Sequence, residues 1–85
     1  MSSALIMRIR QIKEIEVEGL GPRIQQARSA IAGARSLDQI CEEVGVSRTY
    51  WYDLESERIK GTLSIENLRK IEQALGADFG IKFSD

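Results

Sequence analysis

The chain has 85 residues, 42% of them hydrophobic, which suits one compact domain with a thin core. It has one cysteine and no histidine, so an internal disulfide is excluded and a metal site would have to be built from carboxylates. The net charge of -1 counts weakly against nucleic-acid binding, because domains that bind nucleic acid are usually basic.

The sequence contains no apolar run near the roughly 18 residues of a membrane span, and Met1-Ser2-Ser3 lacks the basic start of a signal peptide. We therefore expect a cytoplasmic protein without membrane contact. An enzyme is not expected either, because histidine, a phosphate-cradling glycine loop and paired carboxylates are missing from the sequence. We expect no cofactor, no metal and no small-molecule ligand.

The charges are sorted by segment. Residues 20–36 carry Arg23, Arg28 and Arg35 and no acid. Residues 37–47 carry only acids, which are Asp38, Glu42 and Glu43. Their distribution is therefore more informative than the net charge.

Residues 6–18 are rich in β-branched side chains, but their pattern fits two structures. Ile9, Ile12 and Ile15 recur at helical spacing, whereas residues 13–18 alternate between polar and apolar as a strand does. The abundance of isoleucine and valine favours a strand. We predict an N-terminal extended arm or strand within residues 1–19.

The first clear helix is predicted over residues 22–32. Pro22 follows Gly21 and suits the first helical position, where its missing N–H has no cost. Gly33 closes this helix. The apolar stripe consists of Ile24, Ala27, Ala30 and Ile31.

Two short helices are predicted over residues 37–44 and 48–56. Ser36 and Ser47 precede them as N-caps, and Asp38 adds negative charge at the favourable end of the first. Gly45 supplies the left-handed exit between the helices. The buried faces comprise Leu37, Ile40, Cys41 and Val44 in the first helix and Trp51 and Leu54 in the second, with Val46 placed to pack on Trp51.

A loop over residues 57–62 leads to a fourth helix, which Ser64 caps and Gly76 ends. Its stripe is Leu68, Ile71 and Leu75. Residues 78–83 alternate between polar and apolar, which predicts a short strand. We expect the N- and C-terminal strands to pair, within one chain or across two.

Residues 37–56 satisfy the constraints of two helices joined by a tight turn. Cys41 provides a small side chain where the helices cross, and Gly45 provides the turn. Val46, Trp51 and Leu54 then anchor the second helix. This combined spacing predicts a helix-turn-helix.

Residues 36–55, SLDQICEEVGVSRTYWYDLE, resemble the helix-turn-helix of the lambda-repressor-like family, also called Cro/XRE type. The resemblance extends back to LGPRIQQAR at residues 20–28 and forward to SIENLRKIEQALG at residues 64–76. It implies a mainly α, four-helix DNA-binding domain over residues 20–76, to which we add short N- and C-terminal β-strands in residues 1–19 and 77–85. Its expected partner is double-stranded DNA.

The resemblance also implies site residues. The helix at 48–56 would lie in the major groove, with Arg48 as the candidate for a bidentate contact to guanine. Trp51 would face the core, and Glu55 would bond locally to the next loop or to the first helix. The residues implied to face bases are Ser47, Arg48, Thr49, Tyr52 and Asp53, and those implied to contact phosphates are Arg23, Arg28, Arg58 and Lys60.

Three features depart from the family pattern. Leu37 stands where many relatives carry a glutamine that touches phosphate, Asp53 where a basic or small polar residue is common, and the 57–62 loop is longer. We expect a sequence-specific transcriptional regulator, most simply a repressor, that acts as a homodimer. The alternative is a protein-interaction module or an antitoxin with the same fold and weak or no DNA binding.

Overall fold

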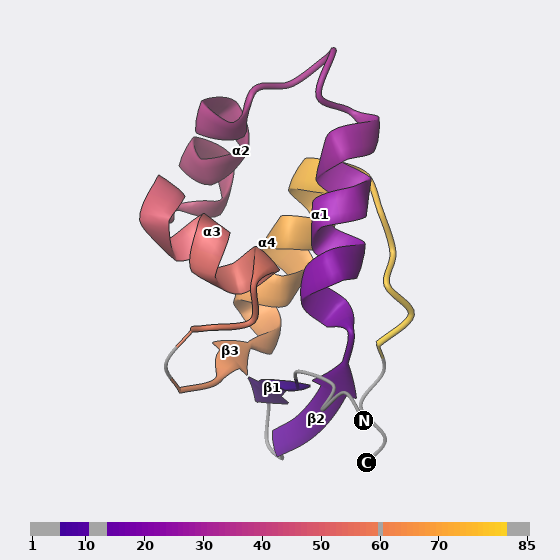
Figure 1. The fold of residues 1–85 in the computed structure, drawn as a ribbon, viewed down its shortest axis with the longest axis vertical. Coiled ribbons are helices and arrows are strands. Elements are labelled where there is room, and N and C mark those ends of the chain that lie inside the picture. Colours follow the sequence, from indigo (N-terminus) through magenta and orange to yellow (C-terminus); the bar gives the residue numbers. More distant parts are fainter. Residues whose placement is uncertain (1–5, 11–13, 60, 82–85) are drawn as a thin grey trace.

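A computed structural model describes residues 6–10, 14–59 and 61–81 of the chain. These residues form a mainly helical domain with four helices and a three-stranded sheet (Figure 1). The strands are β1 (Ile6–Arg10), β2 (Glu14–Glu18) and β3 (Leu63–Ser64). The helices are α1 (Leu20–Ala30), α2 (Leu37–Val44), α3 (Arg48–Glu55) and α4 (Ile65–Leu75). Within the described ranges, no helix is long and apolar enough to cross a membrane.

The N-terminal segment forms strands, as its β-branched composition predicts. β1 and β2 pair antiparallel, with Met7 opposite Val17 and Arg8 opposite Glu16. Met7 and Ile9 are buried, whereas Arg8 and Glu16 are exposed on the other face. The alternation therefore separates a core face from a solvent face, as expected for a sheet covered on one side. Residues 11–13 lie outside the described part of the chain.

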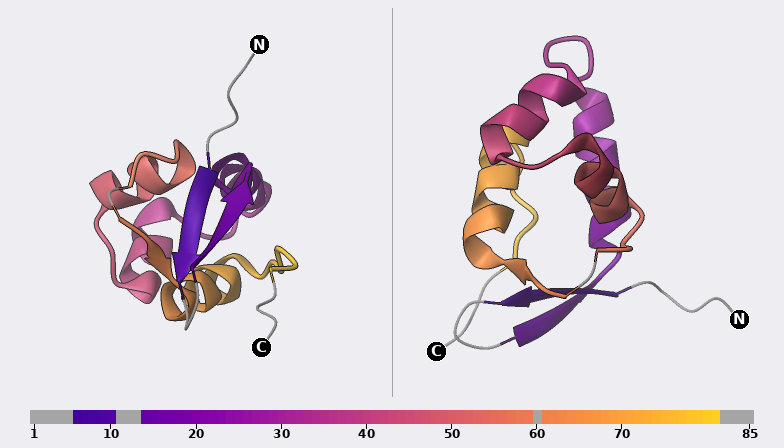
Figure 2. Two further views of the ribbon diagram at one scale, coloured as in Figure 1. Left: turned by 90° about the horizontal axis from the view of Figure 1, so that it is seen from below. Right: turned by 90° about the vertical axis from the view of Figure 1, so that its left-hand side faces the viewer.

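The hairpin lies across one end of the helices (Figure 2). β1 is the central strand, because β3 pairs with it in parallel through Ile9 and Leu63. Both of these side chains are almost completely buried. The sheet therefore covers one end of the apolar core that the helices surround.

The predicted C-terminal strand is wrong for its described part, since residues 78–81 form no strand and no pairing with β1 or β2. Gly80 has a φ of 72°, which interrupts an extended chain. Phe79 and Ile81 are buried all the same. The alternating burial of residues 78–81 therefore arises in a segment without regular secondary structure. Residues 82 and 83, the rest of the predicted strand, lie outside the described residues.

Side chains take the place of a strand partner for this C-terminal segment. The backbone N–H of Phe79 donates to Glu72 Oε2 at 2.9 Å, and the Phe79 carbonyl accepts from Arg23 Nη2 at 2.6 Å. The Ile81 carbonyl accepts from Arg69 Nη2 at 2.8 Å. Because charged groups satisfy its buried backbone, the segment needs no β-ladder.

The predicted helices are present, with small shifts at their ends. α1 runs from Leu20 to Ala30 and not over 22–32, because Gly19 takes a left-handed conformation just before it. Pro22 is still in the first turn, where its missing N–H is harmless. α2 has the predicted bounds, α3 ends at Glu55, one residue before the predicted end, and α4 begins directly after its Ser64 cap.

The core is formed from all of these elements. Its members with no measurable exposure are Ile9, Leu20, Ile24, Ile40, Trp51, Leu54 and Leu68. Trp51 is the largest of them, and it is the aromatic of the 50–52 cluster predicted to face inward. Tyr52 is half exposed, as predicted for its neighbour on a helix.

α1 and the end of α3 approach closely at Gly21. A Cβ on this residue would overlap the Glu55 carbonyl oxygen and lie 2.5 Å from Glu57 Cγ. The Gly21 N–H also donates to Glu57 Oε2 at 3.1 Å. Gly21 therefore sets the distance between these two helices.

We predict that Gly21→Ala lowers the free energy of unfolding by about 1 to 3 kcal/mol, because the backbone has to move to admit the methyl group. Urea denaturation followed by circular dichroism measures it. Gly33→Ala is the matched control, since a Cβ there meets nothing within 4 Å. Equal stability of the two variants would show that the close approach is not tightly packed.

Candidate functional site

A tight turn sets α2 against α3. Gly45 has a φ of 85°, and its N–H and that of Val46 both donate to the Cys41 carbonyl, at 2.8 and 3.0 Å. The Cys41 Sγ lies 3.9 Å from the carbonyl oxygen of Ser47, to which it donates a weak hydrogen bond. Burial raises the pKa of the Cys41 thiol, so the side chain stays neutral and serves as packing.

α3 has a buried face and an exposed face. Trp51 and Leu54 are fully buried at a spacing of three residues. Tyr50 lies between the faces, and its partial burial raises the pKa of its hydroxyl. The exposed side chains at the start of the helix and along its outer face are Ser47, Arg48, Thr49 and Tyr52.

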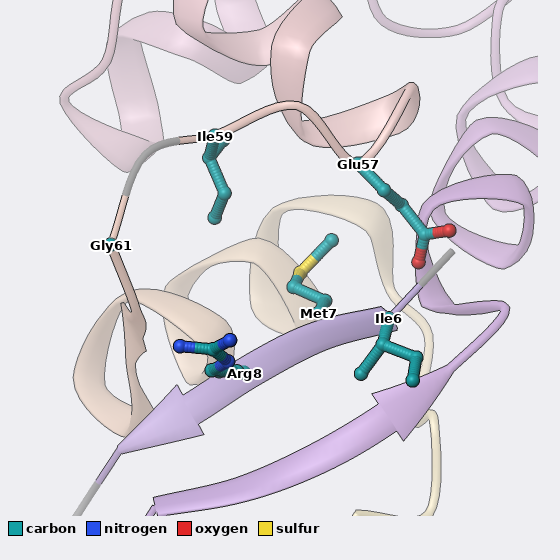
Figure 3. Close-up of a pocket in the computed structure, with 6 residues that line it drawn as sticks. All are labelled: Ile6, Met7, Arg8, Glu57, Ile59 and Gly61. Carbon is teal, nitrogen blue, oxygen red and sulfur yellow. The ribbon is translucent and has the colours of Figure 1, made fainter. Parts of the chain in front are cut away.

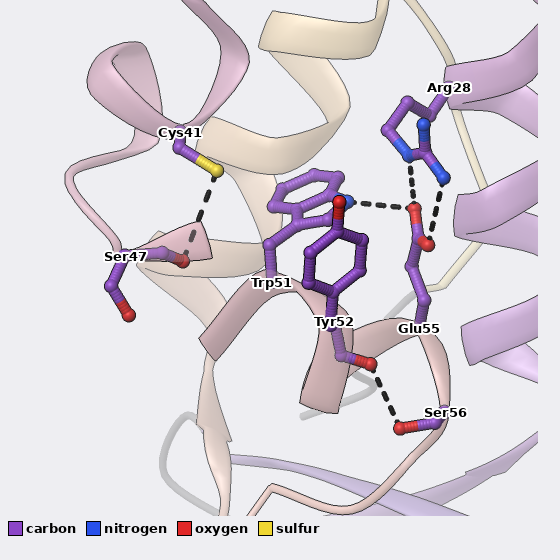
Figure 4. Close-up of polar contacts among 7 residues, drawn as sticks. All are labelled: Arg28, Cys41, Ser47, Trp51, Tyr52, Glu55 and Ser56. Carbon is purple, nitrogen blue, oxygen red and sulfur yellow. Dashed lines mark hydrogen bonds and ion pairs between the residues drawn. The ribbon is translucent and has the colours of Figure 1, made fainter. Parts of the chain in front are cut away.

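A charged network fixes α3 to α1 (Figure 4). Glu55, whose side chain is 7% exposed, accepts from Trp51 Nε1 at 2.7 Å and from Arg28 Nη2 at 3.0 Å. Arg28 Nε donates to the same carboxylate. The hydrogen bond from Arg28 to Glu55 raises the pKa of Arg28. Glu55 therefore bonds to the first helix, as predicted, and its second partner is the indole of Trp51.

Arg23 and Arg28 are both bound by groups of the protein itself. Arg28 is held by Glu55, with only 22% of its side chain exposed. Arg23 binds the Phe79 carbonyl, and its guanidinium carbon lies 5.5 Å from the centre of the Phe79 ring. The segment that contains Phe79 runs along the side of α1 away from α3 (Figures 1 and 2). Phosphate contacts by these two arginines stay predictions.

Arg35 also binds groups of the protein itself. Its Nη1 donates to the Ala74 carbonyl at 2.9 Å, and its Nη2 forms an ion pair with Glu43. The three arginines that make residues 20–36 basic thus all bind protein groups. The bond between Glu55 and the first helix was expected, but the Phe79 and Ala74 carbonyls that bind Arg23 and Arg35 were not, because they lie 56 and 39 residues along the chain.

The structure brings four of the predicted site residues together on α3, which are Ser47, Arg48, Thr49 and Tyr52. Ser47 also caps the helix by accepting from the Tyr50 N–H at 3.0 Å. Asp53 is half-buried, and its carbonyl accepts from the backbone N–H of Arg58, whose side chain is exposed. Lys60 lies outside the described residues.

Arg48 has a charged neighbour that the sequence did not indicate. Its Nε lies 3.4 Å from Asp38 Oδ1. The side chains of Arg48 and Asp38 are 62% and 71% exposed, so solvent and a binding partner can reach both. The ion pair therefore contributes little to stability but places the guanidinium at the junction of α2 and α3.

Two hollows lie near this exposed face or on the far side of the loop after α3, and only the second includes one of its residues, Tyr52. One, of about 210 Å³, lies between β1 and the loop after α3 and is lined by Ile6, Met7, Arg8, Glu57, Ile59 and Gly61 (Figure 3). The other, also about 210 Å³, is a shallow notch between α1 and α3 lined by Gln25, Tyr52, Glu55 and Ser56. Among the described residues, no group of three or more histidine, cysteine or acidic side chains could hold a metal ion.

Comparisons with protein-family models, with curated proteins and with solved structures found no match to this chain. Its function therefore has to be argued from its own residues and their arrangement.

We predict that Glu55→Ala lowers the free energy of unfolding by about 3 kcal/mol, because it leaves Arg28 and the Trp51 indole without their shared acceptor. Urea denaturation measures this loss. Glu43→Ala is the control: it also removes one acid of an arginine pair, but its side chain is 41% exposed. Its cost is expected below about 1 kcal/mol, and equal losses would contradict a special role for Glu55.

Proposed function

We propose that the protein binds double-stranded DNA sequence-specifically as a transcriptional regulator, most simply a repressor, and that α3 enters the major groove. The proposal treats α2, the turn and α3 as a helix-turn-helix of the lambda-repressor-like type. The observation that carries it is the exposed start of α3. Ser47, Arg48 and Thr49 project from a helix whose opposite face is anchored by Trp51 and Leu54.

The chemistry of this exposed face suits base edges and phosphates. The major groove is about 12 Å wide and admits one helix. An arginine can bind guanine O6 and N7 with two N–H groups, and Ser, Thr and Tyr hydroxyls bind base edges or phosphates. Arg48, Thr49 and Tyr52 thus supply donors suited to a groove, and the Glu55 network supports the helix that presents them.

One observation favours the alternative of a protein-interaction module or an antitoxin. Arg28 and Arg35 are paired with Glu55 and Glu43, so part of the positive charge of residues 20–36 is neutralised within the protein. Arg23 keeps its charge, because its partner is the neutral Phe79 carbonyl. Asp38 and Glu42 on α2 are exposed. A surface with this balance suits a basic partner protein better than random DNA, which makes the salt dependence of DNA binding the deciding measurement.

A homodimer belongs to the proposal, because two recognition helices address half-sites about 34 Å apart on one face of DNA. The long axes of the protomer measure 35 and 33 Å. The protomer is thus of the same size as the half-site spacing.

We predict that analytical ultracentrifugation at micromolar concentration gives twice the chain mass of 9.6 kDa. The operator selected in the next experiment should then contain two related half-sites. A species that stays monomeric both alone and with selected DNA would contradict the dimer.

We predict that selection from a random duplex pool enriches a defined site and that its affinity falls steeply with rising salt, because binding releases counterions from phosphates. Arg48→Ala should weaken the selected site by about 1 to 3 kcal/mol. Fluorescence anisotropy measures both effects. Lys70→Ala, which removes one exposed positive charge from α4, is the control and should leave base selectivity unchanged. Failure to enrich any duplex would favour the protein-interaction alternative.

A further inference from the structure

We propose that Asp38 is a positioning residue that orients Arg48 for contact with guanine. The inference rests on the proposed DNA-binding function and names the base that the same surface selects. Its basis is the ion pair that joins Asp38 Oδ1 to Arg48 Nε at 3.4 Å.

Both partners start from fixed points of the backbone. Asp38 is in the first turn of α2, where Ser36 and Gln39 form a reciprocal cap. Arg48 is the first residue of α3, which Ser47 caps. Because caps hold both helix starts and Gly45 closes the turn between them, the backbone positions of Asp38 and Arg48 are fixed relative to each other.

The atom used by Asp38 decides what Arg48 can still bind. A guanidinium donates from Nε and from two terminal nitrogens in one plane. Asp38 is nearest to Nε, which leaves the terminal Nη1 and Nη2 of Arg48 for another acceptor pair. Guanine O6 and N7 form such a pair in the major groove. Arg48 can therefore keep its carboxylate neighbour while its outer edge contacts guanine.

Two consequences follow for selectivity. An arginine held at one edge loses less rotamer freedom when it binds, which strengthens a correctly placed guanine contact. The charge of Asp38 also opposes nearby phosphates, which weakens binding to random duplex. Asp38 thus raises discrimination by acting on the two affinities in opposite directions, whereas an acid that acts only through its charge weakens both affinities alike.

Asp38→Asn tests this assignment, because asparagine keeps the shape and removes the charge. Glu42→Gln is the matched control: Glu42 is exposed on the same helix, one turn later, and also loses one negative charge. Anisotropy titrations at fixed salt measure affinity for the selected site, for the same site with each guanine replaced by 7-deazaguanine, and for a random duplex. Urea midpoints establish that both variants fold.

We expect Asp38→Asn to lower the ratio of the affinity for the selected site to that for random duplex by about fivefold or more. This is a modest part of the discrimination between bases that a good bidentate contact provides. Glu42→Gln should change both affinities by the same factor. In an Arg48→Ala background, Asp38→Asn should behave as Glu42→Gln does. The 7-deazaguanine penalty, which reports the N7 contact, should shrink in Asp38→Asn.

Two outcomes would overturn the role of Asp38 and leave DNA binding intact. One is a selected site that contains no guanine; the other is an Asp38→Asn variant that matches Glu42→Gln on every duplex. If the wild-type protein enriches no duplex, the proposed function fails, and the role of Asp38 fails with it. Asp38→Ser, which keeps a good residue in the first turn of α2, repeats the test if the asparagine variant folds poorly.

Discussion

The orientation of α3 depends on one buried carboxylate. Glu55 accepts from the indole of Trp51 on its own helix and from the guanidinium of Arg28 on α1. A buried charge is costly unless its hydrogen bonds are satisfied, and here both oxygens have donors. Through Glu55, the largest core side chain, Trp51, is linked to Arg28 on α1. A change in the rotation of α3 would break these bonds, so its outward face has one defined position.

Other charged side chains hold segments that the apolar core covers only in part. Arg23, Arg69 and Glu72 bind the backbone of residues 79–81, and Arg35 binds the last turn of α4. In a chain of this size the apolar core is thin, so charged hydrogen bonds to backbone groups complete the packing. The arginines of residues 20–36 therefore have structural roles, whatever they bind outside the protein.

The helices could be predicted from local chemistry. Ser36, Ser47 and Ser64 each cap the helix that the sequence places after them, and Gly45 and Gly76 each take the left-handed conformation that ends a helix. Capping depends on neighbours within a few residues, which a sequence displays directly. The inward position of Trp51 was predictable for the same reason, since it follows from helical spacing.

Features that depend on distant residues could not be predicted in this way. The alternation in residues 78–81 has the period of a strand, yet Glu72 and Arg23 supply the hydrogen bonds that a ladder would have provided. α1 starts before Pro22 because Gly19 turns the chain after β2. From the sequence, Gly21 was an equally good candidate for the residue that precedes the helix. The acidic partners of Arg28 and Arg48 were visible as residues but not as neighbours, because those contacts form only when the helices pack.

This distribution of charge has a consequence for binding under the proposed function. Arg48 is exposed at the start of α3, while the arginines of α1 are committed to Glu55 and to the Phe79 carbonyl. Affinity for DNA of any sequence comes mostly from phosphate neutralisation. The pairing of Arg28 with Glu55 and of Arg35 with Glu43 reduces the positive charge that residues 20–36 could supply for it. Base contacts would then carry a larger share of the affinity, so the protein would depend strongly on a correct site. A net charge of -1 is compatible with a DNA-binding protein of that kind, in which selectivity replaces general electrostatic attraction.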